Sequence, residues 1–460
     1  MKWKITTLVF VSIAAILSGV LLAFWQNRLD LAQTNNKKVQ EFYSQLANSQ
    51  VSFTDAGKLV FPDEQKFLDA KSRYLAAREK FVEVDLKAMK LRLYENGSVV
   101  QELAVLTKGR EGSWWETATG DYAVLGKEAN HFSSIGKVWM PYSIQFYGNF
   151  FIHGWPYYDN GQPVQKIYSG GCIRLATDDA KIVYEFVSKD TPILVFDKEA
   201  VLSYGFLRAR QSGLLPVPPT TAAGLLVVNL ATGQTLLEKN IDEELPIASL
   251  TKLMTGVVAS ELIYLDRLVT VAKPPLAAAL QVFKPQGGER YSAFDLLYPL
   301  LMQSSNDAAA SLAGFIGEPL FVRDMNKKAE SLGMLHTQFA DPSGISADNR
   351  STAKDLVRLL QYIYYKRSFL FDITKGKDYG TFGPRKLDEL KNFNEFYEAE
   401  DLIGVKNGET RAAKQTMITV WNIRTLEGSV PVAIIVLGSD GRVVDTQALL
   451  GWLKNSFAVL

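Results

Sequence analysis

The chain is poor in the residues that most often bind metals, with one cysteine and three histidines in 460 residues. A single thiol cannot form an internal disulfide, so no disulfide framework supports the fold. The three histidines are scattered and no His-Glu-x-x-His sequence occurs, so we expect no metal and no cofactor. The net charge of +1 gives no indication of a nucleic-acid partner, which would favour a strongly basic chain.

Length and composition indicate several globular domains. Hydrophobic residues make up 47% of the chain and charged residues 22%, which is ordinary for folded proteins. A chain of 460 residues exceeds what one hydrophobic core usually supports, so two or three domains are expected.

The N-terminus carries a long apolar segment. Ile5–Trp25 contains no charged residue and follows Lys2 and Lys4, and its length suffices to span a hydrocarbon core of about 30 Å. The basic flank should stay in the cytoplasm, so we expect an uncleaved anchor over residues 1–26, with the rest outside. A cleaved signal peptide is the alternative, although Leu21–Trp25 has no Ala-x-Ala-like cleavage site.

Residues 27–81 are polar and contain no catalytic pattern. Within them Pro62–Lys80 has Phe67 and Tyr74 at helical spacing, continued by Phe81, which predicts one amphipathic helix. We expect this helix to form a stalk or a cap on the next domain, with its aromatic side chains used for packing.

The lone cysteine lies in a glycine-rich stretch that reads Ser169-Gly170-Gly171-Cys172-Ile173-Arg174. Glycines allow a sharp turn and bring backbone N–H groups close to the sulfur, where they could stabilise an oxyanion. His153-Gly154 lies upstream, and histidine is the usual base for a cysteine nucleophile. A small buried cysteine in a tight turn is the structural alternative.

The sequence around these residues resembles the L,D-transpeptidase (YkuD) family. His153-Gly154 and Ser169-x-Gly171-Cys172-Ile173-Arg174 are similar to the family signature, Thr117–Tyr122 is similar to its Thr-Pro-Thr-Gly-x-Phe stretch, and Trp139–Ser143 precedes the histidine strand. Val82–Leu93 is expected to be the opening strand, in a domain of residues 82–200.

This resemblance implies a mostly-β domain that acts on peptidoglycan stem peptides through a thioester. It implies that Cys172 is the nucleophile and His153 the base. The residues that it places around the substrate are Gly154, Ser169, Gly170, Gly171 and Arg174. Many members of the family have histidine where this chain has Gly170, so any supporting role of that histidine is lost.

A proline-rich linker is expected over residues 201–221, because Leu215–Thr221 is rich in proline and therefore stiff. After it, Gly224–Leu230 and Thr235–Glu238 read as two strands joined by a turn.

Three short motifs follow in order. Ser249 and Lys252 have i,i+3 spacing, which places them on one face of a helix. Burial would depress the pKa of such a lysine, and its neutral amine could take the serine proton. Ser-x-x-Lys alone is common on solvated helices, but Ser304-x-Asn306 between two helical runs and the Lys406-x-Gly408 strand come after it.

Together these motifs resemble the D-alanyl-D-alanine carboxypeptidases (S11), the low-molecular-weight penicillin-binding proteins. Asp341–Gly344 and Ser351–Leu356 are also similar to that family. The resemblance implies an α/β penicillin-binding-protein/β-lactamase-like domain over residues 222–460, an antiparallel sheet with helices, with β-lactams as inhibitors.

The resemblance also implies a role for each motif. Ser249 would be acylated with Lys252 as its base, Ser304 would relay a proton, and Asn306 would hold the substrate amide. The strand that faces the substrate comprises Lys406, Asn407, Gly408 and Glu409. Lys406 would meet the carboxylate end of the substrate, and the N–H groups of Ser249 and Glu409 would form the oxyanion hole.

Asn407 departs from the family, which has Lys-Thr-Gly in this strand. An amide is bulkier than a hydroxyl and has a different geometry, so we expect weaker recognition of a terminal carboxylate. Endopeptidase action and a binding module with little turnover are alternatives. A β-lactamase is disfavoured because no Glu-x-x-Leu-Asn segment follows Ser304.

The sequence therefore predicts a peptidoglycan-remodelling enzyme on the wall-facing side of a bacterial cytoplasmic membrane, with stem peptides and the membrane as partners. One alternative is an L,D-transpeptidase with a non-catalytic wall-binding module. Another is a structural wall anchor with both sites inactive, and the two complete residue sets argue against it.

Overall fold

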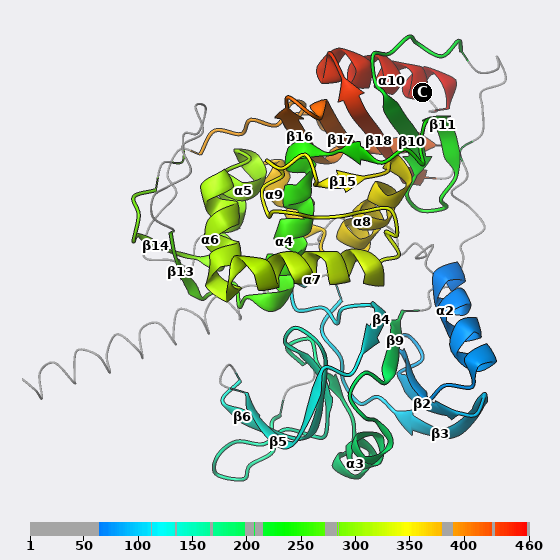
Figure 1. Cartoon of the computed structure of the whole chain (residues 1–460), viewed down its shortest axis with the longest axis vertical. Coiled ribbons are helices and arrows are strands. Elements are labelled where there is room, and N and C mark those ends of the chain that lie inside the picture. Colours follow the sequence, from blue (N-terminus) through cyan, green and yellow to red (C-terminus); the bar gives the residue numbers. More distant parts are fainter. Residues whose placement is uncertain are drawn as a thin grey trace, which may run out of the picture. The chain divides into compact units, whose positions relative to one another are not determined.

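The computed structural model describes residues 64–111, 113–133, 136–165, 169–197, 207, 215–271, 283, 285–379, 390–425 and 428–457. The expected membrane segment Ile5–Trp25 lies outside these residues. Within them, no helix has the length and apolar character needed to cross a bilayer. The described chain comprises a β-rich N-terminal part and an α/β C-terminal part (Figure 1).

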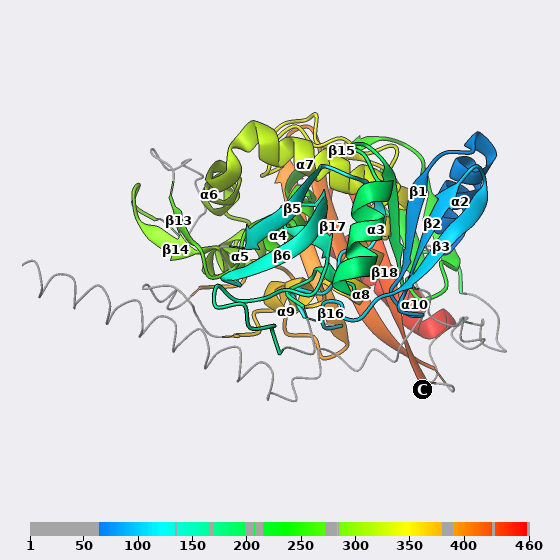
Figure 2. The same cartoon turned by 90° about the horizontal axis from the view of Figure 1, so that it is seen from below.

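The N-terminal part is built on two sheets. The first has the order β3-β2-β1-β9-β4, with β1 Phe81–Asp85, β2 Lys90–Glu95, β3 Ser98–Ala104, β4 Gly120–Ala123 and β9 Pro192–Phe196. The second has the order β5-β6-β7-β8, with β5 Gly126–Ser133, β6 Val138–Tyr147, β7 Phe150–His153 and β8 Ile173–Arg174. Helix α3 (Thr177–Phe186) lies beside β6 (Figure 2), and it also contacts β7. Apolar side chains from both sheets, such as Val84 and Ile152, share one core.

One expectation for this part is wrong, and another is confirmed except at its C-terminal end. The expected single strand Val82–Leu93 is a hairpin of β1 and β2, because the Asp85 carboxylate accepts N–H groups from Lys87 and Ala88 and closes a turn. The expected helix is α2 (Glu64–Ala77), and Phe81 is in β1. Helix α2 nevertheless packs its aromatic side chains against β1, since Tyr74 lies beside Phe81 with ring centroids 5.5 Å apart. It is a cap on the sheet.

The C-terminal part is centred on an antiparallel sheet with the order β11-β10-β18-β17-β16. Its strands are β10 Gly224–Asn229, β11 Thr235–Lys239, β16 Leu402–Thr410, β17 Lys414–Thr425 and β18 Gly428–Ser439. Helix α10 (Arg442–Ser456) covers one face and α8 (Ala353–Lys366) lies on the other (Figure 1). The expected antiparallel sheet with helices is therefore observed.

The remaining helices are η1 Ala248–Leu250, α4 Thr251–Leu262, α5 Ala293–Met302, α6 Asn306–Ile316, α7 Glu318–Ser331 and α9 Phe369–Thr374. Two short ribbons complete the part, β12 (Leu245–Pro246) with β15 (Arg350–Ser351) and β13 (Leu268–Thr270) with β14 (Arg290–Ser292). Helix α4 is buried from Thr251 to Glu261, because α5, α6, α7 and α9 pack around it. It therefore forms the centre of the helical layer.

The described proline-rich segment is attached to the C-terminal part. The Trp452 indole donates to Leu215 O at 3.0 Å, and Thr221 bonds to the Asp445 carboxylate through its N–H and hydroxyl groups. Leu215–Thr221 therefore packs along α10, and most of the expected linker before it lies outside the described residues.

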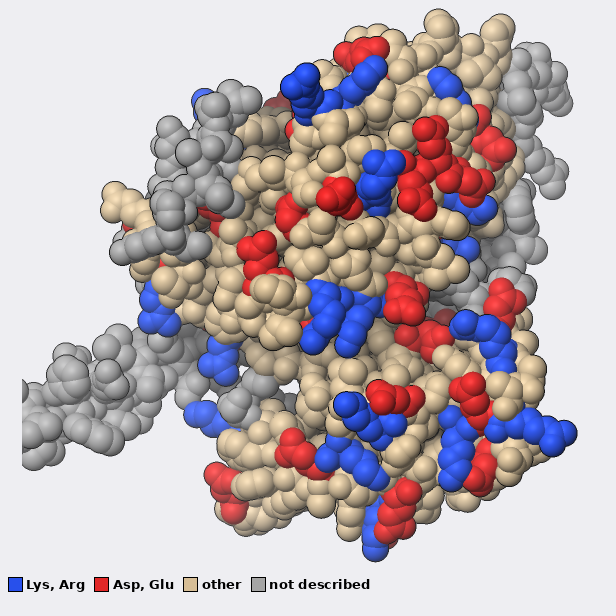
Figure 3. Space-filling model, in the orientation of Figure 1, with Lys and Arg blue, Asp and Glu red and all other residues tan. Residues whose placement is uncertain are grey.

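Charges on the face drawn in Figure 3 are of both signs and interspersed. This distribution agrees with the small net charge of the chain.

Candidate active sites

Ser249 lies in η1, at the point where the chain enters α4. Lys252, in the first turn of α4, is fully buried and its Nζ lies 2.9 Å from Ser249 Oγ and 2.5 Å from Ser343 O. Burial lowers the pKa of Lys252 to about 7, although the Asp341 carboxylate acts in the opposite direction. An amine with this pKa is substantially neutral near pH 7 and can accept the serine proton.

A tight turn at Asp341–Gly344 fixes the partner of this lysine. The Asp341 carboxylate accepts N–H groups from Ser343, Gly344 and Ser346 at 2.7–2.8 Å. Gly344 has φ +84°, and a Cβ there would lie 1.9 Å from Ala248 O. Only glycine allows this approach, which holds Ser343 O against Lys252.

Strand β16 borders the serine on another side. A Cβ at Gly408 would lie 2.7 Å from Ser249 N, so the glycine lets β16 pass directly beside that amide. Lys406 is buried in the same strand, and its Nζ donates to Asn407 O at 2.8 Å. Burial and the charge of Lys252 hold the pKa of Lys406 well below its ordinary value. Glu409 follows Gly408 in β16, so its N–H comes from the strand that passes the nucleophile.

Ser304 and Asn306 come from the junction of α5 and α6, and both helices pack against α4. Ser304 has φ +57°, and its buried Oγ has no hydrogen-bond partner among the described residues. Left-handed backbone at a non-glycine residue costs free energy and is concentrated at functional sites. Asn306 is the first residue of α6.

Cys172 directly precedes β8, which pairs in parallel with β7 so that Ile152 lies opposite Ile173 and His153 opposite Arg174. The turn before the thiol is held by Ser169, whose Oγ donates to Cys172 O and accepts the Gly171 N–H. Gly171 has φ +107°, and a Cβ there would lie 2.5 Å from the Phe150 ring. Gly170 has no atom within 4 Å of an added Cβ, so a side chain would fit at the position where the family often has histidine.

His153 is buried, and its Nδ1 lies 2.6 Å from Gly154 O. Because a carbonyl can only accept, Nδ1 carries the proton and Nε2 is left as the base. Burial lowers the pKa of His153 to about 3, so the imidazole is neutral near pH 7.

The Cys172 thiol bonds to Asn149 O at 3.7 Å, and burial raises its pKa. Among the described residues, the thiol and the imidazole thus each bond to a main-chain carbonyl and not to each other. This site holds a neutral thiol and a neutral base before substrate arrives.

Comparisons with known proteins match both parts of the chain. The L,D-transpeptidase catalytic domain model matches residues 79–195, and the D-alanyl-D-alanine carboxypeptidase model matches residues 215–441. A D-alanyl-D-alanine endopeptidase of Pseudomonas aeruginosa is 34% identical over 255 residues, which cover 52% of this chain and 80% of the relative. The chain belongs to the D-alanyl-D-alanine carboxypeptidase family. It also carries an L,D-transpeptidase catalytic domain.

Other relatives match the same half of the chain. The D-alanyl-D-alanine endopeptidase of Escherichia coli is 31% identical, with 52% of this chain and 79% of the relative covered. The D-alanyl-D-alanine carboxypeptidase DacD of the same organism is also 31% identical, with 56% and 70% covered. A solved D-alanyl-D-alanine carboxypeptidase of Mycobacterium tuberculosis is 26% identical, with a TM-score of 0.46 and 54% of this chain and 98% of that chain covered.

Asn407 is the residue where the sequence led us to expect a departure from the family, and the structure shows how its side chain is bonded. Asn407 Nδ2 donates to Phe393 O at 2.8 Å and to Glu395 Oε2 at 2.6 Å. Both amide hydrogens are thereby directed to the segment before β16. The side chain that replaces the expected hydroxyl is bonded within the protein.

Arg442 is a residue near this strand that the sequence analysis missed. Its guanidinium contacts Glu395 Oε1 at 2.8 Å, Glu409 Oε2 at 3.1 Å and Gly408 O at 3.4 Å. A single arginine after a strand forms no recognisable sequence pattern. The folded structure is needed to show that Arg442 lies beside β16.

Two further predicted residues of the L,D-transpeptidase domain have structural contacts. The Arg174 guanidinium lies 5.8 Å from the Trp155 ring centroid, and its backbone bonds to Thr107. A Cβ at Gly154 would lie 3.0 Å from Thr177 Cα, so this glycine permits close packing with α3. Within the described residues, no group of three His, Cys, Asp or Glu side chains could hold a metal ion.

Proposed function

We propose that this chain has two peptidoglycan-remodelling activities, a cysteine-dependent L,D-transpeptidase and a serine-dependent enzyme acting on D,D bonds. The serine-dependent activity is supported above all by the contact of 2.9 Å between Lys252 Nζ and Ser249 Oγ. The pKa of this lysine is about 7. Nucleophile and base are already in hydrogen-bond contact, as an acyl-transfer site requires.

In the serine reaction, the Lys252 amine takes the Ser249 proton while Oγ attacks the carbonyl carbon of the D,D peptide bond. The N–H groups of Ser249 and Glu409 stabilise the developing oxyanion. Collapse expels the amine, which takes the proton that Lys252 had accepted, and leaves an ester on Ser249. Water then cleaves the ester and regenerates the serine.

For the serine site we favour cleavage of crosslinks over trimming of free pentapeptide ends. The Asn407 amide donates to Phe393 O and Glu395, so it offers little to a terminal carboxylate. Two relatives at 34% and 31% identity bear the name endopeptidase, which points in the same direction.

In the cysteine reaction, His153 Nε2 takes the Cys172 proton as the sulfur attacks a stem-peptide carbonyl. The leaving amine departs with a proton and a thioester remains. An acceptor amine then attacks the thioester, which forms the new amide and releases the thiol. The oxyanion would be stabilised by backbone N–H groups of the glycine-rich turn; the Gly171 N–H would first have to leave Ser169 Oγ.

We also propose that Ile5–Trp25 anchors both domains on the wall-facing side of the cytoplasmic membrane, because its apolar length suits a bilayer. Protease added to intact spheroplasts should digest both domains. Recovery of a mature chain that begins after Ala23 would show a cleaved signal peptide instead.

Mass spectrometry of muropeptides tests both activities in one experiment. Wild type should produce L,D crosslinks and cleave D,D bonds. Cys172→Ala should lose only the first activity and Ser249→Ala only the second. If fluorescent penicillin labels neither wild type nor Cys172→Ala, the carboxypeptidase-family part is a binding module, and unchanged crosslinking by Cys172→Ala would refute the cysteine mechanism.

A further inference from the structure

The carboxypeptidase-family part contacts the L,D-transpeptidase domain at the far end of the helix that begins beside Ser249. Asn149, in the turn between β6 and β7, donates its side-chain amide to Leu262 O at 2.7 Å. Leu262 is the last residue of α4. Gly148 has φ +45°, and a Cβ there would lie 2.2 Å from Leu262 Cδ2. The turn is therefore seated directly on the C-terminus of α4.

The same turn also borders the cysteine nucleophile. The main-chain oxygen of Asn149 accepts the hydrogen bond from the Cys172 thiol. One residue therefore contacts the thiol through its backbone and the other domain through its side chain. Free carbonyl groups at a helix C-terminus are strong acceptors, so this contact fixes the amide side chain.

A second segment, residues 113–117, connects the cysteine turn to the other domain. On one side, Thr117 Oγ1 donates to Gly171 O at 2.9 Å. On the other side, Glu116 O accepts from Arg367 at 3.2 Å and the Glu116 carboxylate pairs with Lys366. Trp114 also packs edge-on against Phe294 of α5, with ring centroids 5.8 Å apart.

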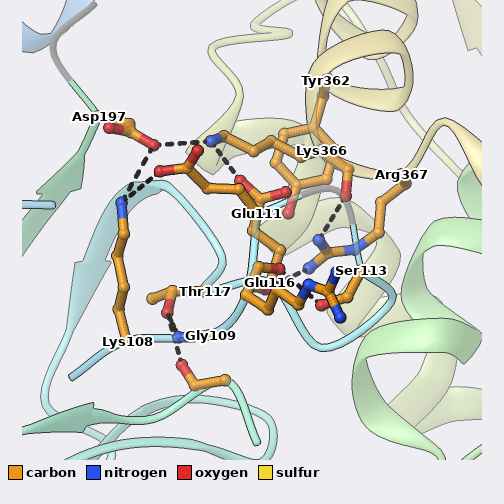
Figure 4. A network of polar contacts seen from close by, with 12 residues as sticks. Lys108, Gly109, Glu111, Ser113, Glu116, Thr117, Asp197, Tyr362, Lys366 and Arg367 are labelled. Carbon is orange, nitrogen blue, oxygen red and sulfur yellow. Dashed lines mark hydrogen bonds and ion pairs between the residues drawn. The ribbon is translucent and has the colours of Figure 1, made fainter. Parts of the chain in front are cut away.

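Figure 4 shows how densely charged groups from both domains meet around this segment. Lys366 of α8 also pairs with Asp197 at 3.0 Å, and Asp197 lies 3.8 Å from Lys108. Lys366, Glu116 and Asp197 are all buried. Buried and mutually paired charges hold a defined geometry, since separating one leaves the others unpaired.

We propose that the carboxypeptidase-family part completes the Cys172 site, and that Asn149 is the positioning residue through which it acts. The proposal rests on the proposed role of Cys172 as nucleophile. Two segments that flank the thiol, the turn at Asn149 and residues 113–117, are each bonded to helices of the other domain. The L,D-transpeptidase site is thus held in shape by contacts from a different catalytic domain.

Asn149→Ala in the full chain tests the proposal. Loss of the bond to Leu262 O should let the turn shift, and small displacements of a catalytic geometry cost rate. We expect kcat for L,D-transpeptidation to fall roughly ten- to a hundred-fold, with KM little changed. A hydrogen bond to a carbonyl favours the neutral thiol, so the pH profile of Cys172 alkylation should move to lower pH. Ser249 acylation by penicillin should be unchanged.

Tyr122→Phe is the matched control. Lys328 Nζ donates to the Tyr122 hydroxyl at 3.3 Å, and this hydroxyl donates to Thr119 O at 2.7 Å. The variant therefore removes one hydrogen bond between the domains and one within the L,D-transpeptidase domain, and it leaves both bonds of Asn149 in place. It should leave kcat and the alkylation profile as in wild type. Equal losses in both variants would mean that the interface acts only through stability, and would overturn the role of Asn149.

Asn149→Asp provides a second variant should the alanine variant fold poorly, because the carboxylate has the same shape but cannot donate to Leu262 O. Wild-type kcat and alkylation in a folded Asn149 variant would overturn the inference while leaving the proposed function intact. Unchanged crosslinking in Cys172→Ala would instead refute the proposed function itself, so the two failures are distinguishable.

Discussion

The two proposed nucleophiles of this chain have different hydrogen-bond partners. Ser249 already contacts its proposed base, with Lys252 Nζ at 2.9 Å. Cys172 and His153 each bond to a backbone carbonyl, so the proton transfer between them requires the thiol to leave Asn149 O.

The difference between the two pairs follows from how far apart their residues lie in the sequence. Ser249 in η1 and Lys252 in the first turn of α4 are three residues apart in one continuous helical segment, so local structure alone brings them together. His153 ends β7 and Cys172 directly precedes β8, its parallel neighbour, and the carbonyl that faces the thiol belongs to a turn bonded to another domain. Ser249 and Lys252 are therefore in contact as a result of local helical structure, whereas the geometry of Cys172 and His153 depends on contacts with other segments of the chain.

Removal of each base should have the largest effect and should separate the two sites completely. A general base contributes roughly 10²–10⁴ in rate. Lys252→Ala should therefore slow Ser249 acylation by this factor while L,D-transpeptidation continues, and His153→Ala should do the reverse. Penicillin acylation kinetics and crosslink formation measure the two effects. Loss of both activities in either variant would show that the sites are not independent.

Loss of Lys366 should destabilise the domain interface and should affect the Cys172 site more than the Ser249 site. Burial would lower the pKa of Lys366, but Glu116 and Asp197 raise it. Lys366→Met leaves those two carboxylates without this partner, which should cost about 3–5 kcal/mol in the free energy of unfolding. Urea denaturation measures the loss, and transpeptidation should fail at lower urea than Ser249 acylation.

Lys354→Ala is the control for this variant, because its pair with Asp242 is solvent-exposed and should contribute little. Equal destabilisation by both substitutions would contradict a special role of the buried network.

The pH dependence of the two sites should differ. Ser249 acylation needs neutral Lys252, whose pKa is about 7, so the acylation rate should fall about tenfold per pH unit below 7 and level off above about 8. His153, with a pKa of about 3, stays neutral over this range. Alkylation of Cys172 should keep rising above pH 8.5, the ordinary thiol pKa, because burial raises its pKa. A shared inflection near pH 7 would disprove this separation.

Asn407→Thr should have the smallest effect, confined to the serine site. The threonine hydroxyl restores a donor for a terminal carboxylate, and a hydrogen bond to a charged group contributes about 1.5–3 kcal/mol. Carboxypeptidase turnover of a D-Ala-D-Ala pentapeptide should rise roughly tenfold, with similar penicillin acylation of Ser249. If the substitution slows pentapeptide trimming, Asn407 is an adapted binding residue.

The secondary structure of the carboxypeptidase-family part could be predicted from the sequence in more detail than that of the L,D-transpeptidase domain. The strands expected at Gly224–Leu230 and Thr235–Glu238 and around Lys406 are observed as β10, β11 and β16, with ends that differ by a residue for the first two. Their patterns are local, since an apolar run, a glycine-containing turn and a return strand suffice. The hairpin of β1 and β2 was missed because its turn depends on one aspartate side chain, within a segment that reads as continuous strand.

The contacts between the domains could not be predicted. Lys366, Glu116 and Asp197 are far apart in sequence and belong to no motif, and only the fold brings them together. The same holds for Asn149 and Leu262. Ionic and hydrogen-bonded pairs of this kind leave no periodic pattern, unlike the apolar faces of helices and strands.

The place of α4 sets how the two reactions can share a substrate. Ser249 lies in η1, directly before α4, and Asn149, beside Cys172, bonds to the last residue of α4. The twelve residues of α4 make a helix of about 18 Å. An extended five-residue stem reaches about 16–18 Å, no more than the length of α4 alone, so a stem that reacts at one residue has no length to spare for the other. We therefore expect a stem processed at Ser249 to dissociate before it binds at Cys172. Coupling of the two reactions would then require the released stem to bind again at the Cys172 site. Free competitor peptide added in excess should prevent this rebinding.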